Sequence, residues 1–252
     1  MRNRNKNTVS AAAARKDNAH LIGAGMNFAA SEAYKLLRTN LMFSFSDNEN
    51  CGIIGMTSAF RGEGKSLTSI NLAYTFAEAK KKVLLIEGDM RLPTMAGRLG
   101  LKGSPGLSNL IAGMSGFREV VQTFKTEVEG KEPVTFHVLV SGDIPPNPSE
   151  LLGSNRMKVF LDSLRNAYDY VILDLPPVTV VTDAVLSSKL VDGMVVVVRS
   201  DHAVRGALAD TIRQLRLVDA KILGFVFNGA TESGGGYYRG KSYYKRDYYY
   251  KK

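Results

Sequence analysis

The sequence predicts an α/β fold in which a doubly wound, mostly parallel sheet is covered by helices on both faces. Short apolar runs alternate with segments of helical periodicity along the 252 residues. A glycine-rich loop connects the first apolar run to the first long amphipathic segment after it, and two of the apolar runs end in acidic residues. Because open α/β sheets bind ligands at the carboxyl ends of their strands, we expect the functional residues at that edge.

Composition and charge divide the chain into three parts. With 44% hydrophobic residues the chain is able to bury the core of one ordinary domain. The net charge of +9 lies in the two ends, +4 in residues 1–20 and +5 in residues 237–252. We therefore predict a flexible basic arm at 1–27, one globular domain at 28–232 and a flexible tail at 233–252. Since the body is neutral, we expect no nucleic-acid groove.

Cysteine content and hydropathy exclude other classes. The single cysteine, Cys51, rules out an internal disulfide and a CxxC metal site, which fits a reducing cytosol. The apolar runs are shorter than the roughly 18 to 20 residues that a membrane span needs, and no apolar signal core follows the first charges. We expect no membrane-spanning segment.

The first predicted element is a helix from Ser31, read as its N-cap, to Phe45. Apolar residues recur on one of its faces. Glu32, Lys35 and Arg38 fall at three-residue steps on another face. From spacing alone, this row is equally consistent with an ordinary solvated charge row.

The segment from Ala59 to Ser66 predicts a phosphate-binding loop. A strand at 52–58 precedes it, a helix at 67–80 follows it, and it matches G-x-x-x-x-G-K-[ST] except that Ala59 replaces the first glycine. Lys65 would neutralise phosphate charge and the Ser66 hydroxyl would hold Mg²⁺. The predicted nucleotide contacts are Phe60, Arg61, Gly62, Glu63, Gly64, Lys65, Ser66 and Leu67.

Acidic residues end two further apolar strands. The run 83–91 closes on Glu87, Asp89 and Arg91, and the run 170–177 contains Asp174. A carboxylate at the end of a strand beside a phosphate loop is a natural direct or water-mediated ligand of Mg²⁺, so we place Asp174 opposite Ser66.

The remaining pattern completes the sheet. We predict helices at 106–113, 150–152, 156–166, 180–190 and 203–218, strands at 134–140, 193–199 and 222–227, and a rigid turn-rich loop at 142–149. Asn228 follows the last strand. Its amide would read a purine edge or simply form a turn.

The C-terminal tail is dominated by tyrosine. Seven of the eleven tyrosines lie in the last sixteen residues, after three glycines and among lysines and arginines. Such a segment cannot form a core and is expected to be a tether. Stacking on single-stranded nucleic acid and a low-complexity tail without specific chemistry are alternatives. We favour a cluster of phosphate acceptors, because a tethered substrate reaches a nucleotide site at high effective concentration. These acceptors are Tyr237, Tyr238, Tyr243, Tyr244, Tyr248, Tyr249 and Tyr250.

Together these motifs resemble the bacterial tyrosine kinases of capsule and exopolysaccharide assembly. The resemblance runs from about Ser31 to Lys252. It rests on the row from Glu32 to Arg38, the loop at 59–66, the Walker A′-like segment 86–91, the Walker B-like segment 173–177 and the tyrosine cluster. Each motif is weak alone, but their order is specific.

The resemblance implies a P-loop NTPase fold with deviant Walker motifs that uses ATP and Mg²⁺ for protein tyrosine phosphorylation. It implies that Lys65 binds the phosphates, that Ser66 and Asp174 organise Mg²⁺, and that Asp89, with Glu87, supplies metal contacts and activates the tyrosine hydroxyl. Glu87 departs from the family's usual Asp and is one methylene longer. The choice of base therefore stays open between Glu87 and Asp89.

The resemblance also implies partners. The row Glu32, Lys35 and Arg38 is similar to a subunit-contact motif, with Lys35 in place of the usual arginine. It implies a ring, expected to be an octamer, in which each tail is phosphorylated in trans. A membrane-anchored adaptor that docks on the kinase, a cognate tyrosine phosphatase and a cytoplasmic location at the inner membrane face are further expectations. The basic arm 1–27 is a candidate contact with the adaptor.

Two other functions compete with the kinase hypothesis. The first is a partitioning or positioning ATPase of the deviant Walker class. Such proteins typically carry lysine at the second loop position, where this chain has Phe60, and they lack a tyrosine-rich tail. The second is a regulator that binds nucleotide without catalysing transfer.

Overall fold

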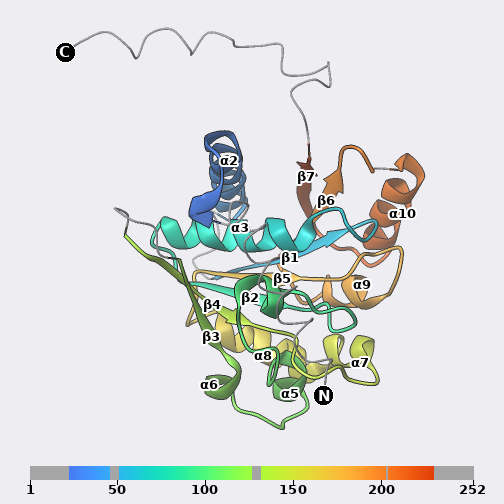
Figure 1. The fold of residues 1–252 in the computed structure, drawn as a ribbon. Helices are drawn as coiled ribbons and strands as arrows, with labels where there is room; N and C mark the ends of the chain where they lie inside the picture. Colours follow the sequence, from blue (N-terminus) through green and yellow to red (C-terminus); the bar gives the residue numbers. More distant parts are fainter. Residues whose placement is uncertain (1–22, 46–50, 127–131, 203, 230–252) are drawn as a thin grey trace, which may run out of the picture.

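The computed structural model describes residues 23–45, 51–126, 132–202 and 204–229. The arm up to residue 22 and the predicted tail at 233–252 lie outside these ranges. The strands of the described part form a seven-stranded sheet in the order β3-β4-β2-β5-β1-β6-β7 (Figure 1). Their bounds are β1 Gly52–Ser58, β2 Val83–Glu87, β3 Gln122–Thr126, β4 Val134–Leu139, β5 Tyr170–Asp174, β6 Gly193–Arg199 and β7 Ile222–Asn228.

All pairs in the sheet are parallel except one. β3 runs antiparallel to β4 at the edge, with Phe124 opposite Phe136. The central strands β1, β2 and β5 are buried along their whole lengths. They are apolar on both faces, as a parallel sheet between two helical layers requires. The prediction of a doubly wound, mostly parallel sheet is confirmed.

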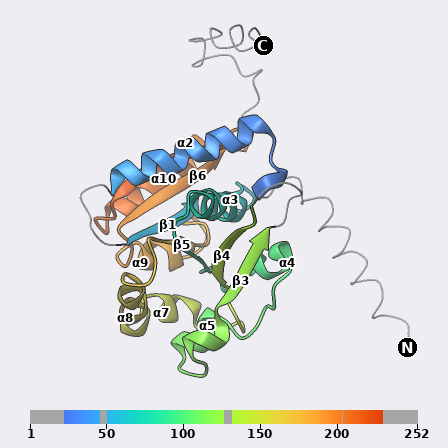
Figure 2. The same ribbon diagram turned by 90° about the vertical axis from the view of Figure 1, so that its left-hand side faces the viewer.

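Helices cover both faces (Figure 2). The helices α2 and α3 lie over one face, with α4 near the sheet edge, whereas α5, α7, α8, α9 and α10 lie over the other. The bounds are η2 Gly23–Gly25, α2 Phe28–Ser44, α3 Lys65–Glu78, α4 Met95–Leu99, α5 Leu107–Ile111, α6 Phe117–Val120, α7 Pro148–Leu152, α8 Asn155–Leu164, α9 Asp183–Ser187 and α10 Arg205–Arg216.

The core divides into two halves because side chains alternate across each strand. Within β5, Val171 and Leu173 belong to the half under α8 and α10, whereas Tyr170 and Ile172 belong to the half under α2 and α3. The Tyr170 ring stacks on Phe76 of α3 with centroids 4.0 Å apart. This period-two alternation holds α3 against the sheet and fixes its first turn at the carboxyl end of β1.

The structure corrects several predicted boundaries. The helix α2 begins at Phe28, and its N-cap is Asn27, whose side chain accepts a hydrogen bond from Ala30 N at 2.8 Å, so the Ser31 cap was wrong. Asn caps a helix as well as Ser does, and the two alanines after Phe28 favour helix.

The edge strand β3 was not predicted, because its sequence Gln-Thr-Phe-Lys-Thr carries only one apolar residue.

A bidentate ion pair secures the amino end of the central strands. Arg165 donates from Nη1 and Nη2 to Asp192 Oδ2 and Oδ1 at 2.9 and 2.8 Å. The same Asp192 Oδ2 accepts the Ile53 amide at 2.8 Å, and Arg165 also reaches the Cys51 carbonyl at 2.9 Å. The pair therefore joins the end of α8 to the start of β1, far from the carboxyl edge of the sheet.

Cys51 should be inert in the folded chain. Its side chain is buried, and burial raises the pKa of the thiol to about 12. The reactive thiolate is therefore scarce at pH 8. We expect a soluble disulfide reagent to modify native protein roughly 10³-fold more slowly than guanidinium-unfolded protein. Equal rates before and after unfolding would show that this thiol is accessible and ionised in the fold.

Candidate functional site

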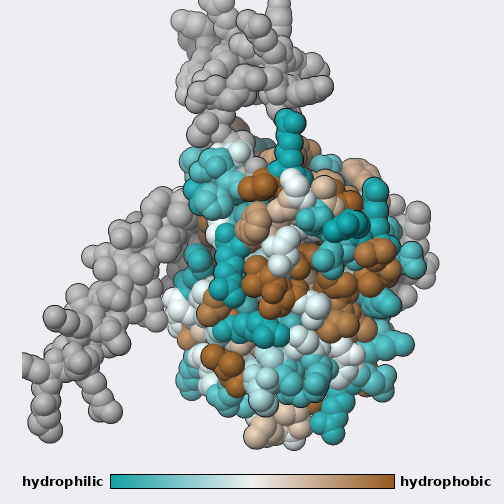
Figure 3. Space-filling view, turned by 90° about the vertical axis from the view of Figure 1, so that its right-hand side faces the viewer, coloured by the Kyte–Doolittle hydropathy of each residue, from teal (hydrophilic) through white to brown (hydrophobic). Residues whose placement is uncertain are grey.

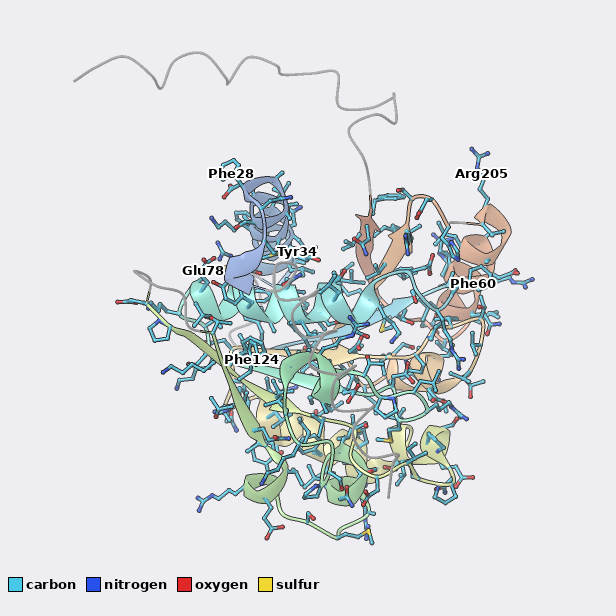
Figure 4. The ribbon with its side chains drawn as sticks, in the orientation of Figure 1. Phe28, Tyr34, Phe60, Glu78, Phe124 and Arg205 are labelled. Carbon is cyan, nitrogen blue, oxygen red and sulfur yellow. The ribbon has the colours of Figure 1, made fainter. Side chains whose placement is uncertain are left out.

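The loop between β1 and α3 lies at the carboxyl end of the sheet. Phe60 marks this loop in Figure 4, and Glu78 marks the opposite end of α3. The peptide amides of the first turn of α3 point toward the loop, and the positive end of the helix dipole lies with them. A strand, a glycine-containing loop and a helix N-terminus therefore form the anion-binding arrangement that the sequence predicts.

The conformation of Gly64 is set by its neighbour from β7. Its φ of 88° is left-handed, and a Cβ built there would lie 1.9 Å from Asn228 Nδ2. That amide nitrogen donates to the Glu63 carbonyl at 3.1 Å. Asn228 therefore closes the loop from the far end of the chain. One hydrogen of its Nδ2 is used in this bond to the loop.

Partly buried hydrogen bonds hold the rest of the loop in place. The Glu63 carboxylate is 1% exposed and accepts the Phe60 amide at 2.8 Å. Ser58 Oγ donates to the Phe60 carbonyl at 2.7 Å, and Thr179 Oγ1 donates to the Ala59 carbonyl at 2.5 Å. Arg61 and Gly62 are exposed. The loop is thus shaped before any ligand arrives, which lowers the entropic cost of binding.

Lys65, Asp89 and Asp174 meet at the centre of the site. Lys65 Nζ lies 3.2 Å from Asp89 Oδ2 and 3.8 Å from Asp174 Oδ1. It is also 3.5 Å from Ser66 Oγ. Lys65 is at the start of α3, which follows β1, whereas Asp89 follows β2 and Asp174 ends β5. The sheet order β2-β5-β1 therefore brings these predicted residues together.

Asp174 is a fully buried carboxylate. It is 1% exposed, and burial raises its pKa although Lys65 and the hydroxyls of Ser66 and Ser69 lower it. Ser69 Oγ lies 3.2 Å from Asp174 Oδ1. A buried charge of this kind needs a cation. The site supplies the Lys65 ammonium, and the carboxylate and hydroxyl oxygens are donors suited to Mg²⁺. The residues present therefore fit a Mg²⁺ nucleotide.

Glu87 is oriented differently from Asp89. Its Oε1 accepts the amides of Thr94 and Met95 at 2.6 and 2.7 Å, and its Oε2 accepts the Ser141 amide at 3.2 Å. Burial raises its pKa against the effect of these bonds. The extra methylene lets the carboxylate reach the start of α4 and the segment after β4. Its side chain holds backbone in place, and this contact pattern was not predicted.

Asp89 keeps its carboxylate at the site. Its Oδ2 accepts from Lys65, and its Oδ1 accepts the Leu92 amide at 3.2 Å. The carboxyl side chain is 13% exposed, whereas that of Asp174 is 1% exposed. Of the two acids between which the base assignment was open, Asp89 faces the phosphate loop.

The three residues of the predicted charge row on α2 do not all make the same kind of contact. Lys35 Nζ pairs with Glu32 Oε1 at 2.8 Å, and both side chains are solvent-accessible. Arg38 Nη1 instead donates to the Thr75 carbonyl at 2.7 Å, at the end of α3. The row therefore presents Glu32 and Lys35 outward, while Arg38 also binds the helix beneath.

No group of three or more His, Cys, Asp or Glu residues suited to holding a metal by themselves occurs within the described ranges. Mg²⁺ sites of nucleotide-binding proteins usually combine one or two carboxylates with the phosphates of the substrate. None of the helices among the described residues is long and apolar enough to cross a bilayer.

Comparisons with known proteins agree with this geometry. A family model described as an AAA domain matches residues 52–223. The chain is 38% identical over 211 residues to the tyrosine-protein kinase YwqD of Bacillus subtilis, covering 82% of this chain and 86% of that protein.

The chain belongs to the bacterial tyrosine-protein kinases. Among solved structures it is similar to the kinase domain of the Escherichia coli tyrosine kinase ETK, with a TM-score of 0.75 and 32% identity over 83% of this chain and 79% of that one. It is also similar to the chimerical protein CapA2B2, with a TM-score of 0.68 and 36% identity over 77% and 82% of the two chains. Membership of this kinase family separates the chain from the partitioning and positioning ATPases.

Asp174→Asn should separate function from stability. Burial raises the pKa of Asp174 in the folded state, so the folded protein binds this proton more tightly than the unfolded chain does. The resulting stabilisation of the fold is present at pH values below the ordinary pKa of Asp. It is lost as the pH rises through the raised pKa of the folded state. In nucleotide-free protein, we expect the variant to gain free energy of unfolding relative to wild type as pH rises from about 4 to about 8. Phosphoryl transfer should fall by about 10²-fold or more if Asp174 organises Mg²⁺ as the sequence predicts, because that carboxylate is lost.

Urea titrations at several pH values and transfer assays check both parts. Ser69→Ala is the control, since it removes one hydrogen bond to Asp174 and keeps the charge. If the free energy of unfolding of wild type instead rises relative to that of Asp174→Asn as the pH rises, the assignment of Asp174 as a buried charge held for function is contradicted.

Proposed function

We propose that this kinase transfers the γ-phosphoryl group of ATP to tyrosines of its own C-terminal cluster, in trans within an oligomer, and thereby regulates polysaccharide synthesis and export. The observation that carries the proposal is the meeting of Lys65, Asp89 and Asp174 at the end of the phosphate loop, in a chain whose tail holds seven tyrosines.

Each predicted site residue receives a role from its position. The amides of residues 60–67 and the Lys65 ammonium would hold the phosphates, and Asn228 Oδ1 would accept from the adenine amine. Ser66, Asp174 and Asp89 would hold Mg²⁺, which supplies charge neutralisation when bound. Glu87 would act by positioning backbone, which leaves Asp89 as the group that receives the tyrosine proton.

The transfer follows the usual chemistry of phosphoryl groups. The phenolic oxygen of tyrosine forms a bond to the γ-phosphorus as the bond to the bridging oxygen breaks, and ADP leaves with that electron pair. The phenolic proton passes to the Asp89 carboxylate. Positioning and charge neutralisation by Lys65 lower the barrier, so this chain needs no covalent intermediate.

The rim of the site suits an aromatic peptide. Segments that follow β2, β4, β5 and β6 expose large apolar residues, and Figure 3 shows apolar side chains gathered on this side of the molecule. These residues include Leu92, Ile144, Val180 and Val204, which are 46–67% exposed. A contiguous patch of exposed apolar residues often marks a site of interaction with another molecule. It would bind tyrosine rings of the incoming tail.

An oligomer would deliver the tail of one subunit to the next. The outward Glu32–Lys35 pair and the exposed Phe28, Leu36 and Phe43 make α2 the proposed contact, with a ring of eight as the expected assembly. Each phosphotyrosine adds about −1.5 to −2 charge at pH 7 and would turn the +5 tail strongly negative. Repulsion among modified tails would then loosen the ring.

Regulation would involve partners outside this chain. A membrane-anchored adaptor is proposed to dock on the kinase, with the basic arm 1–27 as one contact, and to hold it at the cytoplasmic face of the membrane. A cognate tyrosine phosphatase would reset the tail. The chain is similar to the chimerical protein CapA2B2, and this similarity supports looking for a fused or docked partner segment.

Lys65→Met tests the proposed function. The substitution removes the ammonium that lies between Asp89 and Asp174 and would neutralise phosphate, so we expect tail phosphorylation to fall at least about 10³-fold. Incorporation of labelled γ-phosphate into tyrosine measures this, with and without a cytoplasmic adaptor fragment. Lys221→Met is the matched control, because that lysine is exposed and lies just before β7, at the amino edge of the sheet.

Mixing distinguishes transfer in trans from transfer within one chain. Lys65→Met protein added to wild type should become labelled on its own tail. If Lys65→Met protein alone still labels tyrosine, the site assignment is wrong. If wild type binds ATP and never labels tyrosine under either condition, the chain is instead a non-catalytic regulator.

A further inference from the structure

Beside the nucleotide loop, the structure contains an ion-pair cluster of Arg91, Asp183 and Ser149. Arg91 donates from Nε to Asp183 Oδ2 at 3.0 Å and from Nη2 to Asp183 Oδ1 at 3.1 Å. Arg91 Nη2 also donates to Ser149 Oγ at 2.9 Å, and Ser149 Oγ donates to Asp183 Oδ1 at 2.5 Å. Every bond in this triangle is within normal hydrogen-bond length.

The cluster is built around a buried charge. Asp183 is completely buried, whereas the Arg91 side chain is 36% exposed. The guanidinium matches the carboxylate as a planar fork with two parallel bonds, a geometry that lysine cannot reproduce. Because a buried carboxylate without its partner is strongly disfavoured, the cluster fixes Arg91 in one place.

Three separate segments are tied together by this cluster. Arg91 lies in the turn after β2. Ser149 lies in the first turn of α7, where the turn-rich loop 142–149 ends. Asp183 is the first residue of α9, which follows β5. The turn after β2 is the one that carries Asp89. Asp89 lies two residues before Arg91, and its Oδ1 accepts the amide of the following residue, Leu92. A shift of Arg91 would therefore move the Asp89 carboxylate.

We propose that Arg91, Asp183 and Ser149 are positioning residues that hold the Asp89 carboxylate against Lys65 in the geometry needed for phosphoryl transfer. The inference rests on the proposed function of Asp89 as the acceptor of the tyrosine proton. It assigns a purpose to the loop 142–149, which the nucleotide site leaves unused. A displacement of about 1 Å in such a group is enough to cost about 10² in rate.

The Arg165–Asp192 pair provides a matched comparison. It has the same bidentate chemistry, with bonds of 2.9 and 2.8 Å, and it is also partly buried. It lies at the amino end of the strands, whereas Asp89 lies at the carboxyl end. Arg→Lys at either position keeps the charge and removes the fork. Each variant therefore weakens a bidentate ion pair, but only Arg91→Lys does so beside the site.

The experiment compares Arg91→Lys, Ser149→Ala and Arg165→Lys in the full chain. ATP affinity, the maximal rate of tail phosphorylation and the thermal midpoint are measured for each. For Arg91→Lys we expect the rate to fall about 10²-fold while the Kd for ATP changes by less than about threefold, because the phosphate loop is untouched. Ser149→Ala should lose about tenfold in rate, since both hydrogen bonds between Arg91 and Asp183 remain in place. Arg165→Lys should lower the thermal midpoint and leave the rate unchanged.

Two results would overturn the proposal. One is an equal loss of rate in Arg91→Lys and Arg165→Lys, which would show a general effect of destabilisation. The other is an unchanged rate in Arg91→Lys. If wild type releases phosphate from ATP and never labels tyrosine, the proposed function fails independently. In that case the rates at which the three variants release phosphate from ATP are compared instead, and this comparison decides whether the cluster positions Asp89.

Discussion

The ammonium of Lys65, placed between the carboxylates of Asp89 and Asp174, is the interaction on which the rest of the structure depends. Asp174 is buried too deeply to be charged without a cation nearby, and the ammonium that serves is that of Lys65, the first residue of α3. The strands β2, β5 and β1 lie side by side, so their carboxyl ends deliver the three groups to one point. A parallel sheet with this strand order is therefore a condition of the chemistry as well as of the core.

The nucleotide loop is completed by residues distant in sequence. Asn228, at the end of the last strand, both donates to the loop and requires glycine at position 64. Glu63 folds its buried carboxylate back on the loop, and the bond from Arg91 to Asp183 anchors the turn after β2 that carries Asp89. The site is thus held from β7, α9 and the loop itself. Such preorganisation is what phosphoryl transfer demands, since its barrier is lowered mainly by fixed charges.

Sequence patterns predicted the parts of this site that depend on local chemistry. The loop at 59–66 and the acids at strand ends could be found because glycine, lysine and carboxylates occur at fixed spacing after apolar runs. The contacts of Glu87 and Arg38 could not, since each depends on which backbone lies opposite in the fold. The partner of Arg91 lies 92 residues away, and no local pattern indicates it. The polar edge strand β3 escaped prediction because pairing, not hydrophobicity, defines it.

The most direct test of the account is mass spectrometry of the tail after the purified chain has been incubated with Mg²⁺ and ATP labelled at the γ-phosphate. The account predicts label on tyrosines between residues 237 and 250, in proportion to the ADP formed, in the presence of an adaptor fragment. ATP turnover with these residues always unmodified, adaptor present or not, would contradict it. The pocket and the tail would then serve separate purposes.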